Sequence, residues 1–423
     1  MATVEVGSLR APAWRGGFGR LWSAAVLSSF GDALRTAALP LLAVSLTDEP
    51  LLIASVTACG YLPWIFFGLL GGAVADRVDQ RRAMWMVDAL RGLLVASFAV
   101  AVALGHASIG LLIVLAVALT TLQTLFDNAA TALLPALVDR DALGSANTRL
   151  MTGQRIAGGL LGGPVVPLLL AAGAAVPFAA DAVTYLVAAA LIATLPAAAE
   201  TDRKPRPAGS TLRSEIAQGL RTLWRDRALR SLCAATALCN IGMGTQLALL
   251  VVLVTDWLEA GPAGYAAAGT AFTLGSLAGG VVNSRLVARL GRLRSVLLAG
   301  SVQTAALVVM GTVRSLTVLV GMLAVFGLMG MVWNVNTTTL MQERSPAGLL
   351  GRVSSAFRTL AFAGVPLGAL LGGAVATAWG PNTPPLLTAA FFLLAVTALI
   401  PTLNANVSVV EPDDGATTTD ATR

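Results

Sequence analysis

Long apolar stretches separated by short polar loops follow one another along almost the whole chain. Each stretch holds about 20 or more residues, enough for a helix to cross a hydrocarbon core of about 30 Å. The stretches do not alternate apolar and polar residues, as the strands of a membrane barrel do. The pattern predicts an all-α membrane protein with twelve transmembrane helices, at residues 20–45, 51–75, 83–104, 108–135, 151–172, 176–196, 229–253, 263–288, 294–314, 316–341, 353–379 and 384–403.

One long polar stretch divides these helices into two sets of six. The predicted organisation is a cytoplasmic N-terminal segment (1–19), an N-terminal six-helix bundle (20–196), a cytoplasmic linker (197–228), a C-terminal six-helix bundle (229–403) and a disordered cytoplasmic tail (404–423). In the linker, leucine and isoleucine recur at helical spacing, which predicts an interfacial amphipathic helix. The residues on its apolar side are Leu212, Ile216, Leu220 and Leu223.

Composition supports the assignment to a membrane, and the placement of charge predicts the orientation of the chain in it. Only 12% of the residues are charged and 56% are hydrophobic, whereas soluble domains carry about 25% charge. The net charge is +6, yet the arginines fall in alternate loops rather than on one patch, which argues against a nucleic-acid partner. The positive-inside rule predicts a multi-pass protein of the cell inner (plasma) membrane with both termini in the cytoplasm. The first apolar stretch is too long for a cleavable signal, so we expect it to remain in the mature protein.

Several activities are excluded by residues that the chain lacks. Its one lysine, Lys204, lies in the linker outside any phosphate-binding loop, so we expect no ATP partner. Its one histidine, His106, rules out multi-histidine metal sites. No dinucleotide signature or catalytic constellation is present, so we expect neither a cofactor nor an enzyme. The three cysteines fall inside predicted helices and are interpreted as packing residues.

Charged residues inside the predicted helices are the first functional candidates, because each costs about 2.5 to 3.5 kcal/mol to insert. Asp32 and Arg35 lie three residues apart, halfway across the bilayer, on one helix face. We favour a proton-coupling role for this pair over a purely structural one. Asp181 is expected at a solvated helix end, with proton loading as the alternative. Asp88 and Arg91 are expected to form a structural ion pair.

The segment GGAVADRVDQRR contains the pattern G-x-x-x-D-R-x-x-x-R-R, from Gly72 to Arg82. It resembles the loop between the second and third helices of major facilitator superfamily transporters. Other stretches resemble the branch of drug:proton antiporters that holds macrolide efflux pumps and the enterobactin exporter. These stretches are SSFGDALRTAALPLLAVSLT, LFDNAATALLPALVDRDALGSAN, EIAQGLRTLWRDRALRSL and NVNTTTLMQERSPAGLLGRVSSAFRTL. The resemblance implies two pseudo-symmetric six-helix bundles and a monomer.

The resemblance also implies a gate built on the charged loop. Asp76 would cap the cytoplasmic end of the helix at 353–379, and Arg77 would pair locally. Arg81 or Arg82 would pair with Asp127 while the cytoplasmic side is closed. The chain departs from the family pattern at Asp79, where glycine is usual. The counterpart loop in the second half, Gly280–Arg294, has Asn283 or Ser284 in place of the first acid.

A second motif lies in the fifth predicted helix. Gly159, Gly163 and Pro164 form the G-x-x-x-G-P core of a motif that in this superfamily marks antiporters. Glycines allow close helix packing and proline bends a helix, which suits a hinge between the bundles. The chain departs from the longer motif, with Leu150 where a glycine is expected and no paired glycines after Pro164.

Neutral polar residues at membrane depth are candidates for a substrate cavity, since their helices line the cavity in this fold. Hydrogen bonds between helices are an equally good interpretation of each one. The predicted cavity residues are Gln123, Asn240, Gln246, Trp333, Asn334 and Asn336.

Taken together, these features predict a secondary active efflux transporter that works by alternating access. Its partners would be protons, the lipid bilayer and an amphipathic small molecule such as an antibiotic, a siderophore or another natural product. Proton antiport is the expected driving reaction, with Asp32 as the proton carrier. The alternatives are an importer or facilitator of the same fold, and a membrane sensor that transports nothing.

Overall fold

The computed structural model describes residues 16–67, 79–138, 142–195, 212–346 and 349–407. Within these ranges the regular elements are helices, with no strand. The first half contains α1 (Gly17–Leu46), α2 (Pro50–Phe67), α4 (Gln80–Ala103), α5 (Ile109–Leu137), α6 (Leu143–Arg155), the π-helix η2 (Ile156–Gly162), α7 (Gly163–Ala172) and α8 (Val176–Ala193). The second half contains α9 (Leu212–Arg225), α10 (Arg227–Val252), the π-helix η3 (Leu253–Trp257), α11 (Gly261–Leu290), α12 (Arg292–Thr312), α13 (Leu316–Arg344), α14 (Leu350–Phe362), α15 (Gly364–Trp379) and α16 (Thr383–Val407).

The prediction of twelve membrane helices is confirmed. Ten spans among the described residues are long and apolar enough to cross a bilayer by length and composition alone. The other two are α1 and α2. Helix α1 carries Arg20, Asp32 and Arg35, which lower its hydropathy, and α2 contributes a shorter apolar stretch, Pro50–Trp64. The fifth span joins α6, η2 and α7, and the eleventh joins α14 and α15.

Polar side chains cap several of these helices at the positions where the apolar stretches begin. The Ser108 hydroxyl accepts a hydrogen bond from the backbone N–H of Leu111 at 3.3 Å, at the start of α5. The Asp226 carboxylate accepts one from the N–H of Ala228 at 2.8 Å, at the start of α10. Such caps satisfy backbone donors that have no partner inside the helix.

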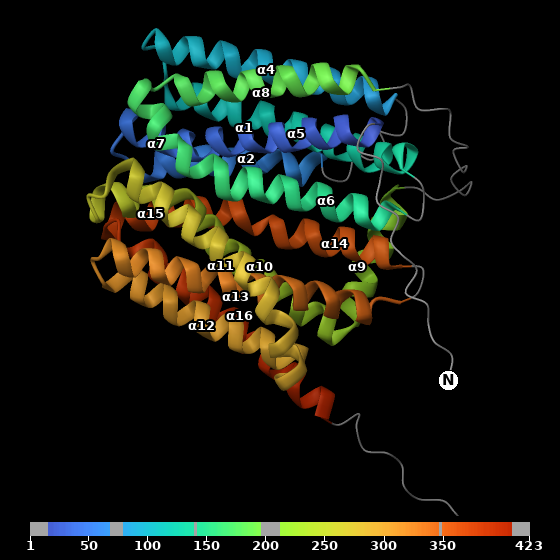
Figure 1. Cartoon of the computed structure of the whole chain (residues 1–423). Helices are drawn as coiled ribbons and strands as arrows, with labels where there is room; N and C mark the ends of the chain where they lie inside the picture. Colours follow the sequence, from blue (N-terminus) through green and yellow to red (C-terminus); the bar gives the residue numbers. More distant parts are fainter. Residues whose placement is uncertain (1–15, 68–78, 139–141, 196–211, 347–348, 408–423) are drawn as a thin grey trace, which may run out of the picture.

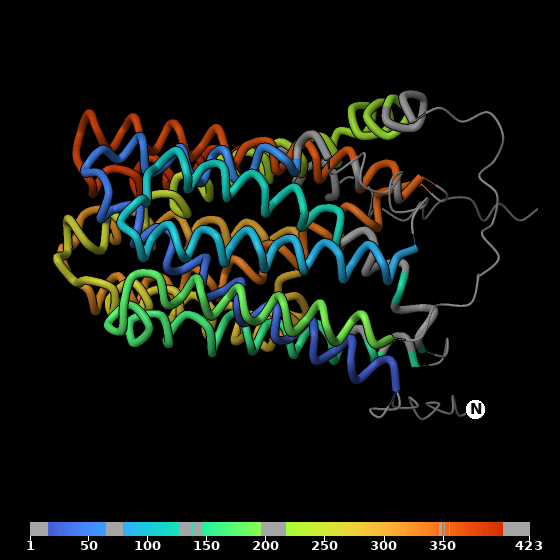
Figure 2. Tube along the Cα trace, turned by 90° about the horizontal axis from the view of Figure 1, so that it is seen from above, coloured from blue at the N-terminus to red at the C-terminus, as the bar shows by residue number. Residues whose placement is uncertain are grey.

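The helices form two stacked groups, α1 to α8 and α10 to α16 (Figure 1). We call the end where α1 begins and α9 lies the linker end, and the opposite end, where α1 turns into α2, the far end; Figure 2 shows both from a second direction. A hydrophobic cluster in the far halves of the helices contains residues of both groups, among them Leu39 and Ala54 of the first and Leu249 and Ala369 of the second. The two bundles therefore share one apolar core at the far end.

At the linker end the packing is different. The buried cluster there, which includes Phe18, Met84, Leu133 and Ile192, belongs to the first bundle alone. The fifth span shows the same asymmetry, because α7 packs against α11 of the second bundle whereas α6 packs mainly against α1. Contact between the bundles is thus concentrated at the far end.

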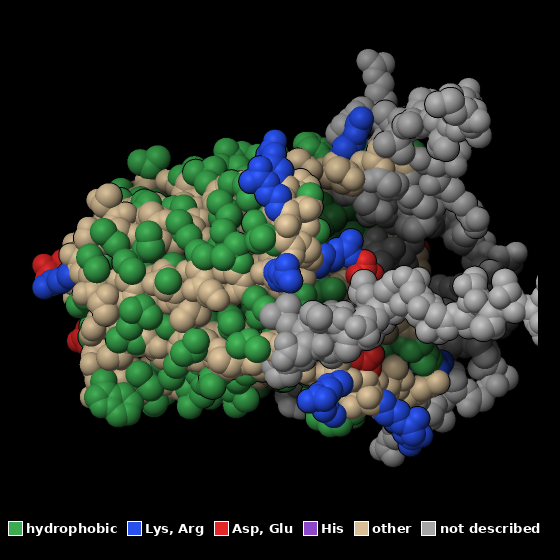
Figure 3. All heavy atoms as spheres, turned by 90° about the horizontal axis from the view of Figure 1, so that it is seen from below, with side chains coloured by type: hydrophobic (Ala, Val, Ile, Leu, Met, Phe, Trp, Pro, Cys, Tyr) green, Lys and Arg blue, Asp and Glu red, His purple; other side chains and the backbone are tan. Residues whose placement is uncertain are grey.

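The flank of the molecule is apolar, as expected for a surface in contact with lipid (Figure 3). Large hydrophobic side chains lie outward there, such as Val114 of α5, Leu168 of α7 and Val281 of α11, each more than 60% exposed. Most of the Lys and Arg side chains visible in Figure 3 lie toward the linker end. The predicted helix in the linker is present as α9, which packs against α14.

Candidate functional site

Asp32 and Arg35 form an ion pair in the middle of α1. A terminal nitrogen of Arg35, Nη2, lies 2.6 Å from Oδ1 of Asp32. The side chains are 30% and 16% exposed for Asp32 and Arg35, respectively. The predicted pairing is therefore present, and both groups keep limited access to the surroundings.

Arg35 also binds a second carboxylate, which the sequence did not predict. Its Nε atom lies 3.1 Å from Oδ2 of Asp181 on α8, and the Asp181 side chain is completely buried. The expectation that Asp181 lies at a solvated helix end is therefore wrong. The reason is the close approach of α8 to α1 at Gly31, where a Cβ atom would overlap the Thr184 hydroxyl and the Asp181 carboxylate. We call Asp32, Arg35 and Asp181 the charged triad; its formal charge is −1.

Tyr185, one turn along α8 from Asp181, connects this triad to a second ion pair. Its hydroxyl donates a 2.5 Å hydrogen bond to Oδ1 of Asp32. The ring of Tyr185 also lies 5.2 Å from the guanidinium carbon of Arg91 on α4, within cation–π distance. One buried tyrosine therefore contacts both the triad and Arg91.

The predicted ion pair of Asp88 and Arg91 is confirmed, at 3.2 Å between Oδ1 and Nη1. Both side chains are buried, and Arg91 also donates a hydrogen bond to Oε1 of Gln123 on α5. Gln123 was expected in the substrate cavity, but the structure places its side-chain oxygen on Arg91 within the first bundle. The ring of Phe126 lies 5.3 Å from the Arg91 guanidinium carbon.

A cavity of about 610 Å³ lies between the two bundles. The first bundle contributes Arg35 and polar or apolar residues of α1, α2 and α5, and the second contributes residues of α10, α11 and α14. Four aromatic side chains lie on its wall, namely Tyr61, Trp64, Tyr265 and Phe362. Because Arg35 lines the cavity, the charged triad reaches the space in which a ligand would bind. This volume is in the range of small-molecule sites.

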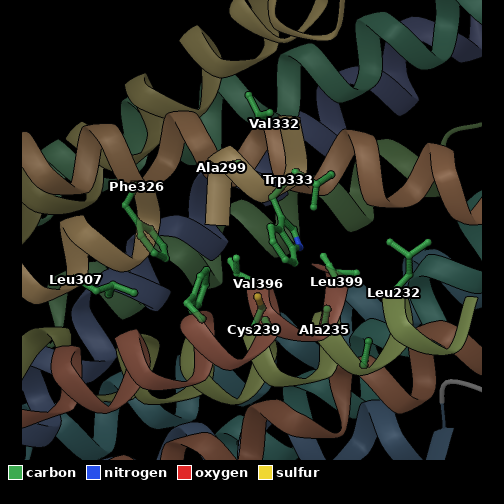
Figure 4. Close-up of a cluster of buried hydrophobic side chains, with 14 of the residues drawn as sticks. Leu232, Ala235, Cys239, Ala299, Leu307, Phe326, Val332, Trp333, Val396 and Leu399 are labelled. Atoms are coloured by element: carbon green, nitrogen blue, oxygen red, sulfur yellow. The ribbon is translucent and has the colours of Figure 1, made fainter. Parts of the chain in front are cut away.

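The residues that the sequence suggested for this cavity lie elsewhere. Gln246 is buried, and Asn240 is half-buried, in α10, and neither belongs to the cavity wall just described. Trp333 is 6% exposed and packs in the hydrophobic core of the second bundle, beside Ala299, Val396 and Leu399 (Figure 4). Trp333 therefore follows neither interpretation, because it lies outside the cavity wall and its Nε1 atom has no hydrogen-bond partner in the described part of the chain.

The two remaining candidates on α13 differ from each other. Asn334 is exposed, outside the cavity wall. Asn336 is buried and donates a 2.6 Å hydrogen bond to Oδ1 of Asn283 on α11. This bond joins two helices, so Asn336 follows the interhelical interpretation. Asn283 is also one of the two residues, with Ser284, that can correspond to Asp76 of the charged loop in the first half.

Only part of the predicted gate lies in the described residues. Gly72, Asp76 and Arg77 fall outside them, as does the side chain of Asp127, whose backbone belongs to α5. Arg81 donates a hydrogen bond to the carbonyl oxygen of Ala193 at the end of α8. Pairing between Asp127 and Arg81 or Arg82 stays a prediction.

The departure at Asp79 has a structural function. Its carboxylate accepts a 3.2 Å hydrogen bond from the backbone N–H of Arg82 and caps the start of α4. Glycine at this position would offer no such acceptor.

The antiporter-like motif spans the junction of the π-helix η2, which contains Gly159, and α7, which begins at Gly163. A Cβ atom at Gly159 would lie 2.6 Å from Thr273 of α11, so Gly159 does allow close contact between the bundles. The expectation that Gly163 has the same role is wrong, because open space surrounds the position of its Cβ, whereas Gly162 faces Phe30 and Ala33 of α1. A π-helical turn holds an extra residue, which moves later residues to another face. Pro164 lies at the start of α7.

Arg358 of α14 also lines the cavity, although it is not among the predicted site residues. The spacing of charged residues in the sequence does distinguish Arg358. Arg35 and Arg91 each follow an aspartate by three residues, which places a carboxylate on the same helix face. The residues three and four positions before Arg358 are the serines Ser355 and Ser354, which supply no such carboxylate.

Comparison with protein families gives one match that covers nearly the whole chain. Residues 7–419 match the family described as transmembrane secretion effector, MFS_3. The chain is 28% identical over 376 residues to the multidrug efflux pump Tap of Mycobacterium tuberculosis, covering 84% of this chain and 86% of that protein. It is 27% identical over 396 residues to an uncharacterised MFS-type transporter of Sinorhizobium fredii, covering 89% and 91%.

Solved structures share the fold at low sequence identity. A bacterial homologue of the iron transporter ferroportin, in an inward-facing state, gives a TM-score of 0.75 at 15% identity and covers 91% of this chain and 98% of that one. The nucleoside transporter NupG gives a TM-score of 0.69 at 12% identity, with 91% of this chain and 99% of that one covered. These similarities show the fold alone.

Proposed function

Because the chain belongs to the transmembrane secretion effector family of major facilitator superfamily transporters, we propose that it exports an amphipathic small molecule in exchange for protons. The family relationship makes it a multi-pass membrane transporter and not an enzyme. Direction, coupling and substrate are the parts that we propose. The observation that carries the proposal is the charged triad, whose Arg35 lines the cavity between the bundles.

In the proposed mechanism, Asp32 exchanges the proton. It is the more exposed carboxylate of the triad, at 30%, whereas Asp181 is completely buried. With both carboxylates ionised the triad carries −1, and protonation of Asp32 makes it neutral. Arg35 keeps an ionised partner throughout, because Asp181 still holds its Nε atom. A proton and a cationic group of the substrate would compete for the same carboxylate, as antiport requires.

Alternating access in this proposal is a rocking of residues 20–196 against residues 229–403. The shared apolar core at the far end and the separate packing at the linker end support a state that is closed on one side. The positive-inside rule assigns the linker end to the cytoplasm, which makes this state inward-facing. The inward-facing ferroportin homologue, with a TM-score of 0.75, is consistent with that assignment.

The proposal is tested in proteoliposomes that contain the full chain and a trapped pH-sensitive dye. A panel of amphipathic antibiotics is added, and proton movement is recorded together with movement of each compound. We expect proton uptake opposite to compound movement, abolished by Asp32→Asn and kept in Asp256→Asn, which alters an exposed aspartate near the far end. Coupled proton flux at the normal rate in Asp32→Asn would exclude Asp32 as the carrier.

Multidrug efflux by the Tap pumps, at 28% identity, supports export over import. Direction follows from the sign of the coupling, which is read in the same vesicles by imposing a proton gradient of either sign. Accumulation of the compounds only in vesicles with an acidic interior is expected for an antiporter, which the inward proton gradient of a cell drives as an exporter. Accumulation only in vesicles with an acidic exterior would instead indicate a symporter, which the same gradient drives as an importer.

A further inference from the structure

Arg358 differs from the other two arginines near the centre of the molecule. Arg35 has two carboxylate partners, and Arg91 has Asp88 and Gln123. Arg358 lines the cavity with an exposed side chain, and no carboxylate in the described part of the chain pairs with it. It lies eight residues into α14 from Leu350, about 12 Å along the helix axis.

An unpaired cation at this depth is costly. Placing an arginine inside a membrane span costs free energy, so ionisable residues there are functional candidates by default. Many arginines avoid this cost by reaching an interface or a partner. Arg358 instead points into the cavity between the bundles, where a ligand would be its neighbour.

The two sides of the cavity carry opposite formal charge. On the first-bundle side, Arg35 lines the cavity, and its carboxylate partners Asp32 and Asp181, which are not part of the lining, bring the formal charge of the triad to −1. On the second-bundle wall, Arg358 contributes +1. Tyr61 and Trp64 of α2, and Tyr265 and Phe362 of the second bundle, supply flat apolar surface on the same cavity. A molecule with one charge would meet a favourable wall and an unfavourable one.

We propose that the substrate is a zwitterionic molecule with a flat, apolar body, whose acidic group binds Arg358 and whose cationic group lies toward Asp32. This inference rests on the proposed transport function and adds the chemical class of the substrate. A guanidinium is well suited to a carboxylate, because it offers paired N–H donors and keeps its charge. The cationic end of the substrate competes with the proton for Asp32. The acidic end stays bound to Arg358 whether Asp32 is protonated or ionised.

The test is equilibrium binding to the purified full chain in lipid nanodiscs at pH 7.5, followed by fluorescence anisotropy. Rhodamine B, a zwitterion, is compared with its methyl ester, a cation with the same ring system, and with fluorescein, which lacks the cationic end. We expect rhodamine B to bind at least about tenfold more tightly than either, a difference of about 1.4 kcal/mol. Arg358→Gln should remove the advantage over the ester, Arg358→Lys should keep part of it, and the surface variant Arg289→Gln should keep all of it.

The outcomes separate this inference from the transport proposal, because equilibrium binding needs neither a proton gradient nor a direction. Equal or tighter binding of the ester, or no binding of rhodamine B by folded protein, overturns the inference while proton-coupled flux is judged independently. A gate function of Arg358 predicts slower transport in Arg358→Gln with the same preference between the dyes. That result would also overturn the inference. If Arg358→Gln does not fold, the wild-type preference and the Arg358→Lys variant still decide.

Discussion

The hydroxyl of Tyr185 donates a 2.5 Å hydrogen bond to Asp32, and the same ring lies 5.2 Å from the guanidinium carbon of Arg91. One side chain on α8 thus contacts the carboxylate that we assign to proton exchange and a buried cation on α4. A hydrogen bond to a charged group is worth about 1.5 to 3 kcal/mol. Tyr185 therefore helps to fix the position of Asp32 relative to Arg35.

Tyr185→Phe separates these two contacts. The ring and its contact with Arg91 remain, whereas the hydrogen bond to Asp32 is lost. We expect proton-driven transport to fall by about tenfold or more, with little change in substrate exchange that moves no net proton. The measurement compares the two modes in the same proteoliposomes. A loss of both modes in equal proportion would contradict a specific function at Asp32 and indicate a structural one.

Arg35→Gln should be strongly destabilising, because it leaves Asp32 and the buried Asp181 without their shared cation. Breaking one partner of a buried ion pair costs about 3 to 5 kcal/mol. Thermal unfolding in detergent should show a large loss of stability in Arg35→Gln. The double variant Arg35→Gln/Asp181→Asn should recover part of it, since the buried carboxylate charge is removed with its partner. Additive losses in the double variant would argue that Asp181 and Arg35 do not interact.

Two glycine substitutions form a matched pair. Gly31→Ala places a methyl group against the Thr184 hydroxyl and the Asp181 carboxylate, whereas Gly163→Ala points into open space. Overpacking of this kind costs about 1 to 3 kcal/mol. We expect Gly31→Ala to lower the unfolding temperature and to reduce coupled transport, and Gly163→Ala to keep both. Equal behaviour of the two variants would contradict the close approach of α1 and α8.

A disulfide tests movement between the bundles at η2. The Cβ position of Gly159 lies 3.6 Å from the Cβ of Thr273 on α11, within the range of about 3.5 to 4.5 Å found in disulfides. Gly159→Cys/Thr273→Cys should form a cross-link under oxidation, arrest transport and regain it after reduction. Each single variant serves as a control for the native cysteines. Full transport by the cross-linked protein would show that this contact does not move.

The helices could be predicted from the sequence, and so could the ion pairs within one helix, Asp32 with Arg35 and Asp88 with Arg91. Residues three apart in a helix lie on the same face, so their spacing alone indicates the contact. It was insufficient for Asp181 with Arg35, which are 146 residues apart. That contact depends on how α8 is rotated about its axis. Lipid and protein core are both apolar, so hydrophobic pattern gives little indication of that rotation. The same ambiguity explains why Trp333 was expected in the cavity rather than in the core.

The apolar core shared by both bundles at the far end gives the conformational equilibrium a temperature dependence. Opening that side exposes to water residues such as Ala54 and Ala369, which are buried between the bundles here. Hydrophobic stabilisation weakens on cooling, so the population of molecules open at the far end should rise as the temperature falls. Organisms that live at different temperatures would then need different side chains at this interface to keep the two populations in balance.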